Sequence, residues 1–135
     1  MYQKIFIIGR LGRDPEMRFT PGGSPVTTFS VATDRQYPGA DGALVKETAW
    51  FKVAAWGKLA ESCNTYLAKG KLVAVEGRLN VDGATGGPRT WVGKDNTVHA
   101  AFEMTAMTVR FLSPSEKAVA DASAEEPDQI EDIPF

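Results

Sequence analysis

The amino-acid sequence predicts an all-β domain with one short helix, built as a five-stranded barrel with a protruding hairpin and followed by a disordered acidic tail. Three observations lead to this fold. Apolar residues recur with a period of two in several separate stretches, which is typical of strands. Helical spacing occurs once, between residues 59 and 69. Clusters of glycine and proline separate these stretches, as turns do.

The first three strands are expected at residues 2–8, 26–33 and 48–56. Residues 2–8 are apolar on both alternating sets, so this strand should be covered on both faces. The segment from Gly9 to Pro15 should end it, because it combines two glycines with a proline. A Gly-rich segment at 37–42 joins the second strand to the third, which predicts a protruding hairpin.

The second half of the domain begins with the helix, which should end at Gly70 and carry Cys63 on its apolar face as a small core residue. A strand follows at residues 71–81, and Gly77 within it indicates a bulge or the sharp bend that closes a small barrel. Residues 82–96 read as a long loop or a flexible hairpin because they are rich in glycine. The last strand, 97–112, shifts its apolar phase near residues 106–108, which predicts a bulge.

Two tryptophans on the third strand are the main candidates for binding. Side chains alternate between the faces of a strand, so Trp50, Lys52 and Trp56 should share one face while Phe51 and Val53 face the core. The two rings would lie roughly 20 Å apart at about 3.3 Å per residue. Unpaired bases stack on such rings and their phosphates need a cation nearby. The alternative is that both rings are buried on a central strand.

Two further aromatic residues are candidates for stacking. Tyr37 stands at the base of the hairpin, where it can either cap the hairpin or stack on a base. Trp91 lies in a polar, Gly-rich loop with little core to bury into, so the binding interpretation is preferred for it. His99 falls among polar positions and reads as a solvated or hydrogen-bonded histidine rather than a catalytic one.

Charge divides the chain into two parts with opposite signs. The domain at residues 1–112 holds 14 basic and 10 acidic side chains, whereas the tail at residues 113–135 holds 1 and 7. A basic domain suggests an anionic partner and an acidic tail suggests a basic one. The tail ends in Asp132, Ile133, Pro134 and Phe135, and this apolar end behind a run of acids can be captured by a basic, hydrophobic pocket on another protein. A role in solubility alone does not explain Ile133 and Phe135.

Several classes of function are not expected. Cys63 is the single cysteine and His99 the single histidine, too few soft ligands for a zinc site, and no other metal or cofactor is indicated. No nucleophile with an adjacent base, no paired carboxylates and no phosphate loop are visible, so an enzyme is not expected. The first residues resemble neither a signal peptide nor a membrane span, which predicts a cytoplasmic protein.

The order of the elements is three strands, a helix and two strands, which is the order of an OB-fold. At this point the chain resembles the bacterial-type single-stranded DNA-binding proteins over nearly its whole length. The motifs that carry the resemblance are residues 8–16 (IGRLGRDPE), 50–61 (WFKVAAWGKLAE), 66–70 (YLAKG), 75–79 (VEGRL) and 132–135 (DIPF).

The resemblance implies a homotetramer that wraps single-stranded DNA without sequence preference in replication, recombination and repair, at the nucleoid, and recruits partner proteins through residues 132–135. Trp50 and Trp56 match stacking positions of the family, and Tyr37 matches a position that is often tryptophan. Arg10 stands where the family more often has asparagine. A strand-end stacking tryptophan is missing near Asn80, and Trp91 is the candidate to replace it. The linker before residues 132–135 is short, which limits how far they can reach.

We therefore expect bases to stack on Trp50, Trp56, Trp91 and Tyr37 while cations neutralise phosphates. The expected cations are Arg10, Arg13, Arg18, Lys52, Lys58, Lys71 and Arg78. For each arginine near a turn, simple solvation is the alternative. The other functional class that we keep is an OB-type module for RNA or for a protein partner, which would lack the acidic tail ending in Phe135.

Overall fold

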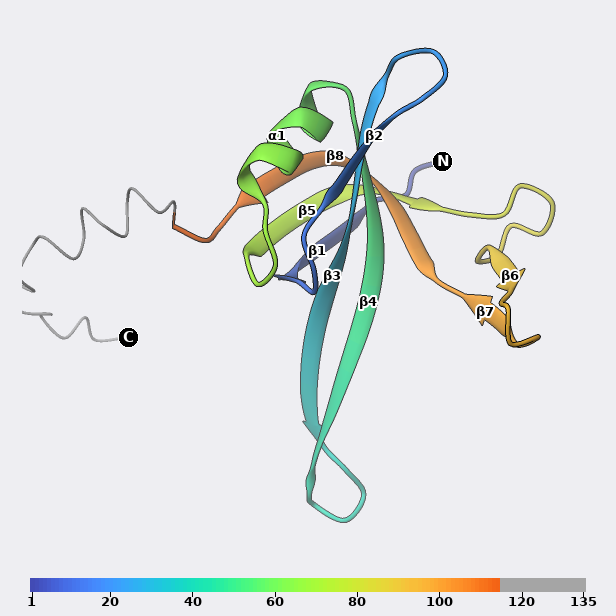
Figure 1. The fold of residues 1–135 in the computed structure, drawn as a ribbon. Helices are drawn as coiled ribbons and strands as arrows, with labels where there is room; N and C mark the ends of the chain where they lie inside the picture. The colour runs from blue at the N-terminus through green and yellow to red at the C-terminus, as the bar shows by residue number, and fades with distance from the viewer. Residues whose placement is uncertain (115–135) are drawn as a thin grey trace, which may run out of the picture.

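A computed structural model describes residues 1–114 of the chain. Its strands and single helix follow one another as in Figure 1: β1 Ile5–Leu11, β2 Glu16–Phe19, β3 Pro25–Pro38, β4 Leu44–Trp56, α1 Lys58–Tyr66, β5 Leu72–Asn80, β6 Thr90–Val92, β7 Val98–Ala100 and β8 Phe102–Phe111. The main sheet has the order β1-β5-β8-β4-β3-β2, and a further pairing joins β1 to β3. This pairing closes β1, β3, β4, β8 and β5 into the five-stranded barrel that the sequence predicts.

One irregularity bends the sheet so that it can close. In the pairing of β5 with β8, Glu76 lies opposite Thr108 but Gly77 lies opposite Ala106, so Met107 has no partner. The bend expected at Gly77 and the bulge expected near residues 106–108 are therefore one and the same feature. Gly77 is required there because a Cβ would collide with the carbonyl oxygen of Thr105. Strands β4 and β8 run parallel, and every other pairing is antiparallel.

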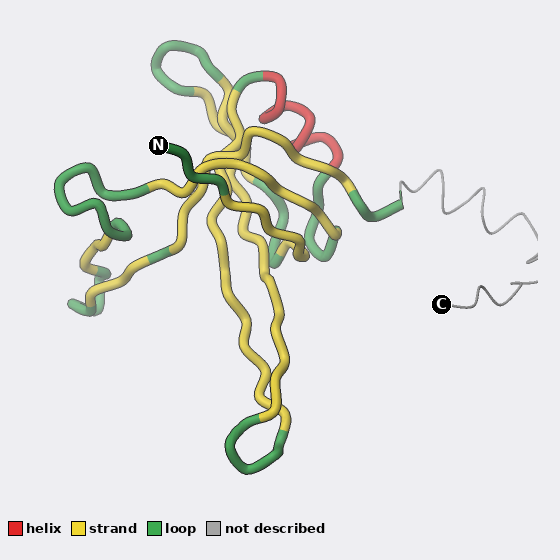
Figure 2. The backbone as a smooth tube through the Cα atoms, turned by 180° about the vertical axis from the view of Figure 1, so that it is seen from behind, coloured by secondary structure: helices red, strands yellow, loops and turns green. Residues whose placement is uncertain are grey.

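Apolar side chains from the strands and the helix form one core inside the barrel. The helix covers one end of the barrel (Figures 1 and 2). Met104, Val31, Val53, Val73 and Val75 are the largest apolar side chains that are fully buried. Helix α1 adds Ala60 and Cys63 to the buried set. It is tied to the barrel by the buried hydroxyl of Thr27, which donates a hydrogen bond to the carbonyl of Ala60 at 2.6 Å. Cys63 is thus a core residue, as predicted.

Two extensions leave the barrel. The β3–β4 hairpin stays paired out to Pro38 and Leu44, and it projects as a long arm in Figure 1. A separate two-stranded ribbon, β6 with β7, lies on another side of the barrel (Figure 1). Its strand β6 lies in the Gly-rich segment 82–96, where the sequence predicts either a loop or a flexible hairpin. The single last strand expected at 97–112 is wrong, because β7 pairs with β6 while β8 joins the main sheet. The four-residue strand β2 is not predicted from the sequence. It forms because the turn at residues 20–24 returns the chain antiparallel to it, pairing Phe19 with Pro25.

The prediction for the first strand is wrong in two respects. The strand does not end at Gly9 but continues through it to Leu11, because Gly9 passes so close to β3 that a Cβ would collide with the backbone of Ala32. The strand is also not covered on both faces within one chain, since Phe6 is 59% and Ile8 50% exposed. In the part of the chain that the structure describes, no helix is long and apolar enough to cross a bilayer.

Candidate nucleic-acid interface

Strand β4 separates its side chains as the alternation predicts. Val53 and Ala55 are buried in the core, and Phe51 packs against it. On the opposite face Trp50 is 51% exposed and Trp56 is 49% exposed. Neither indole is therefore sealed inside the barrel, and both present a ring to solvent on the face that carries Lys52 between them.

The strand registers extend this face into four rows of neighbouring side chains. Trp50 lies beside Ala32 and then Arg10, and Trp56 lies beside Val26 and then Arg18. Between the two tryptophans lie two rows that are mainly polar. They are Ser30–Lys52–Glu103–Asn80, and Glu16–Thr28–Ala54–Thr105–Arg78. The face thus consists of aromatic rings at two ends and a floor of hydrogen-bonding groups between them.

Gly12 determines how the indole of Trp50 lies. A Cβ on Gly12 would stand 2.5 Å from Cζ3 and 2.6 Å from Cη2 of that ring, so the ring packs directly on the glycine backbone. The backbone N–H of Gly12 donates to the carbonyl of Ser30, which fixes the loop against β3. One side of the indole is therefore supported by protein while about half of its surface stays exposed.

Trp91 is brought to the same face by the ribbon. The ammonium of Lys52 lies 4.7 Å from the centre of the Trp91 ring, a cation–π contact between strand β4 and strand β6. The ring also stacks on His99, with centroids 5.7 Å apart and an interplanar angle of 24°. Trp91 is still 39% exposed. The structure thus places Trp91 over the face of β4 that also carries Trp50, Lys52 and Trp56.

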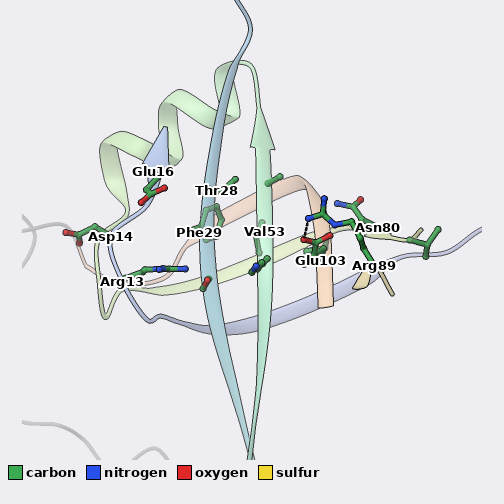
Figure 3. Close-up of a pocket in the computed structure, with 14 residues that line it drawn as sticks. Arg13, Asp14, Glu16, Thr28, Phe29, Val53, Asn80, Arg89 and Glu103 are labelled. Atoms are coloured by element: carbon green, nitrogen blue, oxygen red, sulfur yellow. Dashed lines mark hydrogen bonds and ion pairs between the residues drawn. The ribbon is translucent and has the colours of Figure 1, made fainter. Parts of the chain in front are cut away.

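Two hollows follow this face. One, of about 570 Å³, is lined by residues of β3, β4, β5 and β8 together with Arg13 and Arg89. In Figure 3, Asn80, Arg89 and Glu103 gather at one end of it, and Arg13, Asp14 and Glu16 lie toward the other. The second hollow, of about 680 Å³, includes Trp50 and Lys52 in its lining. Because Arg13, Ser30 and Lys52 line both, the two hollows form one continuous groove.

Several cations of this face are paired with acids. Arg89 binds Glu103 at 2.6 Å, Arg18 binds Glu16 at 3.4 Å and Lys46 binds Asp34 at 3.7 Å. The carboxylate of Glu103 belongs to a side chain that is only 15% exposed. A phosphate that approaches these cations must compete with the acids, whereas Lys52 and Arg13 have no acidic partner among residues 1–114.

The predicted cations do not all reach the groove. Arg13 and Lys52 line it, and Arg10 and Arg18 lie in the outer rows beside Trp50 and Trp56. Arg78 lies at the end of one of the two rows between the tryptophans, outside the lining of both hollows. Lys58 begins helix α1 two residues after Trp56. Lys71 lies elsewhere, because it lines a separate hollow of about 310 Å³ with Tyr66 and Phe111.

Tyr37 lies on the other alternating set of the hairpin from Trp50. Its partner across the hairpin is Val45, and its hydroxyl donates to the carboxylate of Glu47 at 3.0 Å. The guanidinium of Arg35 lies 4.7 Å from the ring centre. Of the two roles considered for this residue, the contacts in the free chain correspond to fixing the hairpin.

Two ionisable groups outside the groove have pKa values that their local structure shifts. Burial raises the pKa of the Cys63 thiol to about 11, so the thiol stays neutral near pH 7. Hydrogen bonds from Thr97, first from its hydroxyl and then from its backbone, lower the pKa of the exposed Asp95. Among the residues that the structure describes, no group of three potential metal ligands occurs.

Sequence reasoning missed Glu103, Asn80 and Arg89 as members of the interface. Period-two alternation puts Glu103 on the other face of its strand from the core residue Met104, so the sequence could show only that Glu103 is a polar, outward position. It could not show that Glu103 stands beside Lys52, because that pairing joins strands that are about 50 residues apart in sequence.

Comparison with known proteins agrees with this architecture. A model described as the single-strand binding protein family matches residues 2–112. The single-stranded DNA-binding protein of Neisseria meningitidis serogroup A is 39% identical over 109 residues, which is 81% of this chain and 59% of the relative. The proteins of the same name from Caldanaerobacter subterraneus and Thermotoga maritima are 36% and 37% identical, covering 98% and 96% of this chain and 82% and 85% of theirs. The chain thus spans less than two thirds of the Neisseria relative.

Solved structures show the same fold. A structure described as the Plasmodium falciparum SSB complex with ssDNA superposes with a TM-score of 0.69 at 26% identity, covering 84% of this chain and 97% of that one. A deletion mutant of the single-stranded DNA binding protein from Thermus aquaticus gives 0.62 at 27% identity, covering 82% and 50%. Since the family model matches almost all of residues 1–114 and the fold is the same, this chain belongs to the single-strand binding protein family.

Proposed function

We propose that the chain binds single-stranded DNA without strong sequence preference, by stacking bases on exposed indoles and pairing phosphates with cations. The observation that carries this proposal is that Trp50 and Trp56 are half exposed on the one face of β4 that also holds Lys52. The names of the relatives support it, as does the neighbour whose description includes ssDNA.

Stacking supplies the affinity that does not depend on sequence. Each base stacked on an aromatic ring contributes about 1–3 kcal/mol, so stacks on Trp50, Trp56 and Trp91 would contribute roughly 3–9 kcal/mol. Every base has an apolar face, and the rings therefore accept any of them. In the free chain the Trp91 ring contacts both the ammonium of Lys52 and the imidazole of His99. A base that stacks where one of these groups lies must first displace that group.

Competition between nucleic acids tests the proposal. A fluorescent oligothymidylate bound to the chain should be displaced by unlabelled single-stranded DNA, and far less by the same sequence in duplex form, because paired bases cannot stack on the indoles. RNA of matching sequence distinguishes an RNA-binding module. If RNA competes better than DNA, or if no oligonucleotide binds, the proposed function is wrong.

We further propose that the chain assembles into a homo-oligomer, most simply a tetramer, through the outer face of β1. Phe6 and Ile8 are exposed there beside Ala74 of β5. Two large apolar side chains on one open strand face favour burial against a second copy. Changing Ile8 to Glu should lower the mass in solution while leaving the circular dichroism spectrum unchanged. An unchanged mass would place the interface elsewhere.

A role in replication, recombination and repair, in the cytoplasm at the nucleoid, follows as a proposal, with partner proteins recruited by residues 132–135. These residues lie outside the described part of the chain, so the support comes from their acidic and apolar sequence. Deleting residues 132–135 should leave DNA affinity intact or slightly higher, because the acids compete for basic groups. A large loss of affinity would mean that the end of the chain has another role.

A further inference from the structure

The floor of the groove contains one acid whose position differs from that of the other acids. Glu103 lies in the row Ser30–Lys52–Glu103–Asn80, between the rows that hold the two tryptophans of β4. Its side chain is 15% exposed, whereas those of Glu16 and Asp34 on the same face are 65% and 54% exposed. A carboxylate with so little exposure to water still repels phosphates, so a groove that only neutralised phosphates would gain nothing from it.

The hydrogen-bonding capacity around Glu103 is only partly used. Arg89 donates to Oε1 at 2.6 Å, and Oε2 has no donor among residues 1–114. On the neighbouring strand, Oδ1 of Asn80 accepts from the hydroxyl of Thr105 at 2.9 Å, and its Nδ2 amide has no acceptor within the described part of the chain. Both side chains line the hollow of about 570 Å³ and lie at the same end of it (Figure 3).

We propose that Glu103, with Asn80 beside it, reads the edge of one pyrimidine seated between Trp50 and Trp56, and that it favours cytosine over thymine or uracil there. This inference rests on the proposed function. The C4 substituent is the exocyclic group that points away from the sugar. In cytosine it is an amino group that donates to a carboxylate, whereas in thymine and uracil it is an oxygen that the carboxylate repels. The amide of Asn80 can donate to the adjacent ring nitrogen of cytosine.

The low exposure of Glu103 strengthens the preference for cytosine over thymine or uracil. In open water a mismatched base would exchange its lost hydrogen bond for one to solvent at little cost. At Glu103 the carboxylate is largely shielded, so a base whose C4 substituent cannot donate leaves it without a partner at that position, in a poorly solvated place. Arg89 orients the carboxylate, because its guanidinium donates a charge-assisted hydrogen bond to Oε1. The remaining stacks stay tolerant of sequence, and the preference is confined to one position.

The test compares two oligonucleotides that differ at this edge. Oligodeoxycytidylate and oligodeoxyuridylate of equal length are titrated into the full chain at fixed salt, and the ratio of their dissociation constants is measured. Uracil is used in place of thymine because it lacks the methyl group that alters stacking. The same ratio is measured for Glu103→Gln, which keeps the size of the side chain, and for Asp34→Asn, which removes one charge from the same face outside both hollows.

We expect Glu103→Gln to reduce the preference for cytosine over uracil about threefold to tenfold, the effect of one hydrogen bond, while Asp34→Asn leaves the ratio as in the unmodified chain. If both variants raise affinity for the two oligonucleotides equally, Glu103 acts only as a charge and the inference is overturned. The unmodified chain gives a second test. Its preference for the cytidylate over the uridylate, taken as the ratio of the two dissociation constants, should exceed the preference measured for a peptide that offers only tryptophan rings. Equal preferences overturn the inference. Failure to bind either oligonucleotide would instead overturn the proposed function.

Discussion

The indole of Trp50 packs on the backbone of Gly12, at a distance that leaves no room for a Cβ. This contact joins the loop after β1 to the exposed face of β4, two segments that are distant in sequence. The glycine therefore positions a ring that we propose to be a stacking platform, and the relationship can be tested without touching the ring itself.

Changing Gly12 to Ala should displace the indole and weaken binding of single-stranded DNA, by about the value of a partly lost stack, 1 kcal/mol or more. The added Cβ would lie 2.5 Å from Cζ3 of the ring, so the ring must move. Fluorescence titration with an oligothymidylate measures the change. Gly22→Ala is the matched control, because nothing lies closer than 3.9 Å to a Cβ there. Equal affinity of the two variants would show that the position of Trp50 does not matter.

Lys52 should contribute one phosphate contact. For single strands the logarithm of affinity falls with the logarithm of salt concentration by about 0.7 for each phosphate neutralised, so Lys52→Met should reduce the slope by about that amount. Methionine keeps the length of the side chain and removes the charge. Lys69→Met, in the turn after helix α1 and outside the lining of both hollows, should leave the slope unchanged. A slope that is unaltered in Lys52→Met would mean that Lys52 serves only the ring of Trp91.

Burial of Cys63 predicts a loss of stability at alkaline pH. The folded state raises the thiol pKa from 9.0 to about 11, so it holds the proton more tightly than the unfolded state does. This contribution to the free energy of unfolding is complete below about pH 9 and is lost as the pH rises toward about pH 11. Urea unfolding across this range should show a steeper decline for the unmodified chain than for Cys63→Ala. Parallel declines would show that the thiol does not titrate differently on folding.

Gly77 should be essential for closing the barrel. Gly77→Ala places a Cβ against the carbonyl oxygen of Thr105, which forces β5 and β8 apart, so we expect destabilisation by about 2 kcal/mol or more. Thermal unfolding measures it. Gly83→Ala, where nothing lies within 4 Å of a Cβ, should change stability little. Similar melting temperatures for the two variants would mean that the bulge at Met107 absorbs the added methyl group.

The sequence contains enough to predict the order of the main strands and the two faces of β4. Alternation placed Trp50 and Trp56 on the face of that strand opposite Phe51 and Val53, but it left open whether that face is covered. Two signals indicated the bend, one in each partner strand: Gly77 in β5 and the shift in apolar phase near residue 107 in β8.

What could not be predicted depends on contacts between distant segments. Gly9 looked like a strand end because glycine is permissive, whereas its function is to admit the backbone of Ala32. The pairing of Glu103 with Lys52 depends on how β8 returns beside β4, and alternation says nothing about register between strands. The position of Trp91 over Lys52 required the fold of the ribbon.

The affinity of Trp56→Ala for single-stranded DNA tests the stacking interface most directly. We expect weaker binding to oligonucleotides of every base composition, by about 1–3 kcal/mol, with the salt slope nearly unchanged, because a neutral stack is lost and no cation is removed. Undiminished affinity, or a loss confined to one sequence, would contradict base stacking on the open face of β4.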